Sequence, residues 1–255
     1  MLYYNEDRYT NPCNPSDGIY RQSISFNGMS PHSSHSIQKQ QKICKEKGLT
    51  VVACFNNDLK KLIKNQIIER LNNLNQNFVS FEKNLHCTFL TLFEVGKPLF
   101  DTTMEDKIIN HIKNFFIKNN LFERINFTLN FDCIRPGTSK GLEYEHKSDG
   151  TVIIYGNYQA NTNFICCAQS LAIELKSNFS DLFPKHYNRI APTVWSTLGY
   201  FQEDFAFTKD VERMFNQWRN LYESDLKLSR INIKELKILK TPTKSLDHSE
   251  HILTI

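Results

Sequence analysis

The sequence predicts an α+β protein in which helices cover the outer faces of β-sheets. Strands and amphipathic helices alternate along most of the chain, and alternation of this kind is typical of helices packed on sheets. The order strand, helix, motif strand, helix, strand also occurs twice, in about residues 48–137 and 150–240. Two such halves related by a pseudo-twofold axis would set their motif strands side by side across a groove. The 255 residues suffice for one large domain or for two small halves that share a core.

The first half opens with an apolar, β-branched run at residues 49–55, which predicts a buried strand. Asn57 then indicates a helix start, and apolar residues follow at helical spacing. Beyond the motif strand, Thr102 opens a capping-box pattern ahead of a second amphipathic helix. Residues 125–131 alternate apolar and polar, which predicts a strand with one solvated face.

The second half repeats this order. Residues 151–155 are rich in β-branched side chains and predict a strand, and residues 164–179 predict a helix. After the second motif strand comes an amphipathic helix whose apolar stripe includes Trp218, which we expect in the core. The alternating run at residues 231–238 predicts the last strand.

The two ends of the chain are polar. Residues 1–47 carry turn signals without a sustained period, which predicts an irregular arm, and residues 241–255 are expected to form a polar tail. The N-terminus lacks the basic start and apolar core of a secretory signal, and no apolar run approaches the roughly 20 residues of a membrane span. Seven cysteines without CxxC spacing favour reduced thiols and a cytoplasmic protein. The net charge of +4 is compatible with an anionic ligand but does not argue for one.

The first motif strand lies within residues 83–93. Side chains on a strand alternate between faces, so His86 and Thr88 are expected to share one face. Cys87 and Phe89 then point to the opposite face. A titratable imidazole and a hydroxyl therefore lie together, while a small apolar residue and an aromatic ring can pack in a core.

A similar stretch occurs about a hundred residues later, at residues 192–201. Thr197 takes the place of Thr88 in this second motif. Trp195 stands where a second histidine would be expected. The functional prediction depends on these two features: the threonine shared by both motifs and the tryptophan in place of a second histidine.

The two motifs and the element order around them resemble the 2H phosphoesterase superfamily, which includes 2′-5′ RNA ligase-like proteins and cyclic phosphodiesterases. That family carries two His-x-Thr/Ser-hydrophobic motifs, one in each half of a duplicated, bilobal α+β fold. The resemblance implies two antiparallel sheets that flank a central groove, with helices outside. It covers roughly residues 48–240 and departs from the family pattern at Trp195.

In the chemistry that the resemblance implies, one histidine deprotonates the attacking water or 2′-hydroxyl and the other protonates the leaving oxygen. The two hydroxyls bind phosphate oxygens, and no metal or other cofactor is needed. Carried over to this chain, His86 takes an acid/base role, and Thr88 and Thr197 bind phosphate. Trp195 cannot replace a histidine, because indole has one N–H donor and no useful basicity.

Three hypotheses for Trp195 remain open. In the first, the groove binds a nucleotide without cutting it, and the indole stacks on a base. In the second, His186 or His146 supplies the missing catalytic group. In the third, the cleft is vestigial and the protein is structural. Arg189, like Arg135, could reach a phosphate, although a surface position is the default for arginine.

The predicted ligand is a nucleotide phosphodiester: a 2′,3′-cyclic phosphate, an RNA end or a cyclic oligonucleotide. If active, the protein is a metal-independent phosphodiesterase; the alternatives are an inactive nucleotide-binding or RNA-binding protein and an interaction protein with a vestigial cleft. The sequence shows no zinc spacing, Gly-rich phosphate loop or nucleophile elbow. We therefore expect no metal, no other cofactor and no membrane partner, while the oligomeric state stays open.

Overall fold

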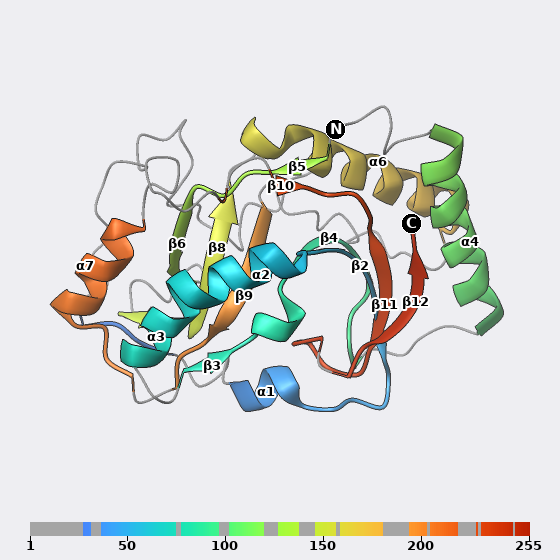
Figure 1. The fold of residues 1–255 in the computed structure, drawn as a ribbon. Helices are drawn as coiled ribbons and strands as arrows, with labels where there is room; N and C mark the ends of the chain where they lie inside the picture. The colour runs from blue at the N-terminus through green and yellow to red at the C-terminus, as the bar shows by residue number, and fades with distance from the viewer. Residues whose placement is uncertain are drawn as a thin grey trace.

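The computed structural model describes residues 28–31, 37–74, 78–96, 102–119, 127–137, 146–156, 159–180, 194–202, 205–218, 228, 231–246 and 248–255. The predicted α+β class is confirmed, because these residues form helices together with two four-stranded antiparallel sheets (Figure 1). Two short strand pairs complete the described sheets: β1 (Ser30–Pro31) with β7 (Lys147–Ser148), and β5 (Thr128–Leu129) with β10 (Ile231–Asn232).

The first sheet has the strand order β12-β11-β2-β4. Its members are β2 (Gly48–Cys54), β4 (His86–Phe93), β11 (Lys237–Thr241) and β12 (Glu250–Thr254). Strand β4 holds the first motif and lies at the edge of this sheet. Its neighbour β2 in turn pairs with β11 from the far end of the chain.

The second sheet has the strand order β3-β9-β8-β6. Its members are β3 (Val79–Ser80), β6 (Cys133–Pro136), β8 (Thr151–Gly156) and β9 (Val194–Tyr200). Strand β9 holds the second motif. Each sheet therefore combines strands from both of the predicted halves of the chain.

The helices after residue 48 lie where the apolar periodicity predicts them, whereas α1 (Ile37–Gln41) lies in the segment predicted to be irregular. Those after residue 48 are α2 (Asn57–Ile63), α3 (Glu69–Leu74), α4 (Thr102–Asn119), α6 (Thr162–Asn178) and α7 (Lys209–Gln217), with a π-helical turn (Lys64–Ile68) joining α2 to α3. Helix α2 is capped by Asn56, whose side chain accepts a hydrogen bond from the Leu59 N–H at 2.8 Å. The cap thus lies one residue before the predicted helix start.

Aromatic side chains join the sheets to the helices. The Phe89 ring, on the buried face of β4, packs against Phe116 of α4 and Phe164 of α6, with centroids 5.7 and 5.1 Å away. Helices α4 and α6 therefore cover the face of β4 opposite His86. Helix α7 lies at the opposite end of the molecule from α4 (Figure 1). Trp218 follows α7, accepts a hydrogen bond at its backbone oxygen from the Ile134 N–H of β6 and is 2% exposed, as predicted for a core residue.

The polar tail predicted for residues 241–255 is wrong as a description of this segment. It contains β12, which pairs with β11, and the side chains of Thr243 and Ser245 are buried. Sequence periodicity missed β12 because its apolar residues Ile252 and Leu253 are adjacent and do not alternate, although both pack against the core. Of the predicted arm at residues 1–47, the structure describes β1, α1 and the residues next to them, and the remainder lies outside the described residues.

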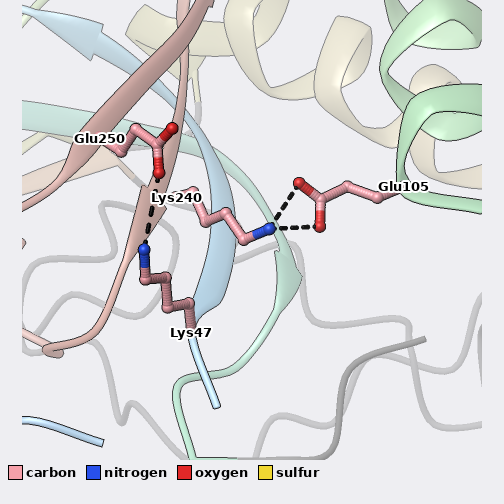
Figure 2. Close-up of polar contacts among 4 residues, drawn as sticks. All are labelled: Lys47, Glu105, Lys240 and Glu250. Atoms are coloured by element: carbon pink, nitrogen blue, oxygen red, sulfur yellow. Dashed lines mark hydrogen bonds and ion pairs between the residues drawn. The ribbon is translucent and has the colours of Figure 1, made fainter. Parts of the chain in front are cut away.

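Two ion pairs attach these C-terminal strands to the rest of the protein (Figure 2). Lys240 of β11 donates to both carboxylate oxygens of Glu105 on α4, at 2.7 and 2.9 Å. Lys47, just before β2, pairs with Glu250 of β12 at 3.5 Å. The first pair is largely shielded from water, so it fixes α4 against the first sheet more firmly than an exposed pair would.

No helix within the described ranges has the length and apolar character needed to cross a membrane.

Candidate functional site

The two motif strands are neighbours in space although they belong to different sheets. The Cys87 thiol on β4 accepts a hydrogen bond from the backbone of Trp195 on β9. Burial raises the pKa of this thiol to about 12, and the hydrogen bond opposes that shift only in part. Cys87 is therefore a neutral packing residue at the contact between the two strands.

Both motif strands show the alternation that the sequence predicts. The side chains on the less buried face are His86, Thr88, Trp195 and Thr197, and those on the buried face are Cys87, Phe89, Ser196 and Leu198. Each of the four positions in the first motif has the same exposure class as its counterpart in the second. Each strand thus turns its motif residues away from the core.

His86 is held in one tautomer by the turn that precedes β4. Its Nδ1 lies 2.5 Å from the backbone oxygen of Asn84, so Nδ1 carries the hydrogen and Nε2 keeps its lone pair. Removal from water lowers the pKa of His86, the positive charge of Lys60 lowers it further, and the Asn84 hydrogen bond opposes both. The imidazole is therefore neutral near pH 7, in the form that accepts a proton at Nε2.

Strand register places two further side chains on the face that carries His86 and Thr88. Cys54 is the cross-strand partner of His86, and Lys237 lies in register with Val52, the partner of Thr88. Paired residues point to the same face of a sheet, so Cys54 and Lys237 share the face of the first motif. Burial raises the pKa of the Cys54 thiol, against the opposing charges of Lys237 and Lys60.

Two ammonium groups therefore lie close to the first motif. Lys60 of α2 donates to the backbone oxygen of Lys83 at 3.0 Å, and Lys237 pairs with Glu235 at 3.2 Å. The positive charge of Lys60 favours an anion near His86, whereas the charge of Lys237 is offset by Glu235. The sequence motifs did not indicate these lysines. The structure divides the predicted strand at residues 231–238 into β10 and β11, and the pairing of β11 with β2 places Lys237 beside the motif.

On the second sheet, register extends the face of the second motif across three strands. Tyr155 is the partner of Trp195, Ile153 is the partner of Thr197, and Arg135 is the partner of Ile153. Arg135 therefore shares a face with Thr197 and Trp195. Its guanidinium carbon lies 5.1 Å from the centre of the Tyr155 ring.

The expectation of a surface position for Arg135 is wrong, because this side chain is only 7% exposed. The aromatic ring of Tyr155 offers the guanidinium a favourable contact, and that contact comes from a strand twenty residues away in the sequence. The local sequence around Arg135 could not reveal it.

The second motif has Gly199 where the first has Leu90. A Cβ atom at Gly199 would lie 2.4 Å from the backbone oxygen of Val79 and 2.4 Å from the ring of Phe78. Glycine is therefore needed for the close approach of β3 to β9. The first motif strand has no partner on its corresponding side within its sheet and accommodates leucine.

The other candidate residues lie apart from this arrangement or outside the described part of the chain. His146 is exposed and precedes β8 at the end where Thr151 pairs with Tyr200. Trp195 pairs with Tyr155, four residues farther along β8 than Thr151. Four residues of an extended strand span about 13 Å, so the end of β8 near His146 is this far from the partner of Trp195. His186 and Arg189 lie outside the described residues, so a role for His186 in place of Trp195 stays a hypothesis.

Chemically, the described site offers a proton acceptor on one strand and hydroxyls on both. Within the described residues, no group of three or more His, Cys, Asp or Glu side chains is placed to hold a metal ion. The six cysteines that the structure describes are free thiols. No protein-family model matches the chain, and no curated protein matches it.

Proposed function

We propose that this chain is a 2H phosphoesterase-like protein that binds the phosphodiester of a nucleotide between its two motif strands. The observation that carries the proposal is the adjacency of β4 and β9, each with its motif residues on the less buried face. Thr88 and Thr197 donate hydrogen bonds to phosphate oxygens. The two sheets form the walls of a groove related by a pseudo-twofold axis.

His86 is the general base of the proposed reaction. Its neutral imidazole, with Nδ1 anchored to the Asn84 oxygen, has the protonation state that the role requires. An in-line displacement also needs an acid on the far side of the phosphorus. Trp195 supplies none, and a missing acid or base typically costs about 10²–10⁴-fold in rate, so turnover is weak or absent.

The proposed ligand is a 2′,3′-cyclic phosphate of a nucleotide or RNA end, or a cyclic oligonucleotide. The charge of Lys60 near the first motif supports an anionic ligand. Trp195, part-exposed on the face of the second motif, offers a ring on which a base can stack. The free thiols support a reducing compartment, which we propose is the cytoplasm.

One set of assays tests this function. Wild type, His86→Ala and Trp195→His are incubated with 2′,3′-cyclic mononucleotides and cyclic dinucleotides, and both binding and product are measured. We expect binding by wild type, loss of any turnover in His86→Ala, and a gain of turnover in Trp195→His. Turnover that persists in His86→Ala would overturn the assignment of the base.

The same assays separate the alternatives. Affinity without product in the wild type identifies an inactive nucleotide-binding protein, which the replacement of the second histidine by Trp195 favours. Absence of binding by all three variants would contradict the proposal and favour an interaction protein with a vestigial cleft.

A further inference from the structure

Arg135 of β6 is a buried cation that forms no ion pair with any residue that the structure describes. The side chain is 7% exposed, and its Nε is buried and makes no hydrogen bond. Along the described ranges, no carboxylate forms an ion pair with this guanidinium; its recorded side-chain contact is the Tyr155 ring. Buried charges in proteins are normally paired, because removal from water is costly. An unpaired one calls for a ligand.

The register of the second sheet places this charge beside the proposed phosphodiester site. Arg135, Ile153 and Thr197 form one row across β6, β8 and β9, and their Cα atoms span two strand spacings, about 10 Å. The guanidinium extends over Tyr155, in the adjacent row that also contains Trp195. The charge therefore lies on the face of the second motif, but not at the threonine hydroxyl itself.

Guanidinium chemistry points to a phosphate as the missing anion. Arginine stays charged at all relevant pH values, and its planar fork binds two phosphate oxygens at once. A phosphodiester carries one negative charge, whereas a terminal phosphate carries up to two. A terminal phosphate is thus the better counterion for a buried charge that lies some distance from Thr197.

We infer that Arg135, supported by the Tyr155 ring, forms a second anion subsite that binds a terminal phosphate of the nucleotide ligand. The phosphodiester itself occupies the site of His86, Thr88 and Thr197. The identity of the ligand as a nucleotide rests on the proposed function, whereas the anion subsite does not.

A purely structural arginine predicts a different response to substitution. If Arg135 only stabilised the fold, its removal would lower the melting temperature. An unpaired buried charge instead destabilises the empty protein, so Arg135→Met should raise the melting temperature while it keeps the apolar stem over Tyr155. Arg135→Lys keeps the charge but loses the planar fork.

Thermal unfolding of the full chain tests the subsite. Wild type, Arg135→Met, Arg135→Lys and the control Arg213→Met are melted alone, with inorganic pyrophosphate, and with sodium chloride at equal ionic strength. Arg213 is a suitable control because it is exposed and pairs only with Asp210 three residues away. Pyrophosphate should raise the melting temperature of wild type and of Arg213→Met, less that of Arg135→Lys, and least that of Arg135→Met.

The pyrophosphate shift decides the outcome. A shift in Arg135→Met equal to that of wild type would overturn the subsite, whichever way the melting temperature of the empty protein moves. If Arg135→Met does not fold, Arg135→Lys carries the test, and an undiminished shift in that variant overturns the proposal equally.

Nucleotide binding then tests the ligand. Wild type should bind a nucleoside 2′,3′-cyclic phosphate that carries a 5′-phosphate at least about tenfold more tightly than one without it, the ratio expected for a charge-assisted hydrogen bond. Arg135→Met should bind the two equally. Equal binding by wild type would overturn the terminal-phosphate assignment. If neither nucleotide binds while the pyrophosphate shift depends on Arg135, the proposed function fails and the subsite stands.

Discussion

Strands β4 and β9 follow the same pattern of side chains but differ in chemistry. On the face of β4, His86 is a neutral base, and the charges of Lys60 and Lys237 lie near it. On the face of β9, Trp195 has no basicity, and the charge nearby is the permanent one of Arg135. The feature that both strands keep is the threonine hydroxyl. Two strands with the same alternation of side chains therefore differ in acid–base capacity, and under the proposed function only the face of β4 supplies a base.

The two strands also differ in how they are packed. Phe89 of β4 contacts three aromatic rings, those of Phe116, Phe127 and Phe164. Leu198 occupies the corresponding position of β9 and is buried as well, but its side chain is aliphatic and smaller. The stability of the protein should therefore depend more strongly on Phe89, the residue after Thr88, than on Leu198, the residue after Thr197.

The largest expected effect is the loss of this aromatic packing. Phe89→Ala should lower the free energy of unfolding by about 3–5 kcal/mol, because it leaves a cavity between β4, α4 and α6. Leu198→Ala should also destabilise, by about 2–5 kcal/mol, and by less than Phe89→Ala. Urea unfolding of both variants measures the difference, and a smaller loss for Phe89→Ala would contradict the packing comparison.

The second effect concerns the close approach of β3 to β9. Gly199→Ala should lower the free energy of unfolding by about 1–3 kcal/mol, since the added methyl group would overlap the Val79 carbonyl and the Phe78 ring. A replacement of glycine by alanine at a site with room normally stabilises a protein. Urea unfolding distinguishes the two, and a gain in stability would show that β3 does not approach as described.

The features that the sequence predicted well are local. Alternation along β4 and β9 sufficed to assign His86 and Thr197 to the less buried face and Cys87 to the core, because a strand has a period of two whatever surrounds it. The helices after residue 48 were likewise predicted from apolar periodicity, whereas α1, in the predicted irregular arm, was not.

The features that the sequence did not predict depend on partners far along the chain. The burial of Arg135 is set by Tyr155, and the proximity of Lys237 to Thr88 is set by the pairing of β11 with β2. Strand β12 is ordered by its pairing with β11 and by the packing of Ile252 and Leu253 against the core. None of these depends on a periodic pattern within one segment.

Cys87 and Ser196 occupy the same middle position in the two motifs but differ in hydrogen bonding. The Ser196 hydroxyl on the buried face of β9 makes no hydrogen bond, whereas the Cys87 thiol accepts one from the backbone of Trp195. Ser196→Ala should therefore raise the free energy of unfolding by about 1 kcal/mol, and Cys87→Ala should lower it by a similar amount. Denaturant unfolding of both variants provides the test; destabilisation by Ser196→Ala would mean that the hydroxyl is satisfied.

The smallest expected effect is a pH dependence of the free energy of unfolding that arises from His86 of β4. Because folding lowers the pKa of His86, the unfolded chain binds a proton more readily than the folded one as pH falls below the ordinary value of about 6.5. Stability should be unaffected by this residue above that pH and should decrease below it. His86 is only part-buried, so the decrease should be modest.

Unfolding measured at a series of pH values from 8 to 5 tests this prediction. His86→Gln should remove part of the decrease in stability at low pH, and Trp195→Phe should leave it unchanged. Identical pH profiles for wild type and His86→Gln would contradict a lowered pKa at His86.

The most direct test of a single phosphate site shared by β4 and β9 is a double-mutant cycle on the two threonines. Affinity for a nucleoside 2′,3′-cyclic phosphate is measured by calorimetry for wild type, Thr88→Val, Thr197→Val and the double variant. We expect each single variant to bind about tenfold more weakly, as for the loss of a hydrogen bond to a charged group. The double variant should lose less than the product of the single losses, because both hydroxyls bind one phosphate. Wild-type affinity in Thr197→Val, alongside a loss in Thr88→Val, would contradict the shared site.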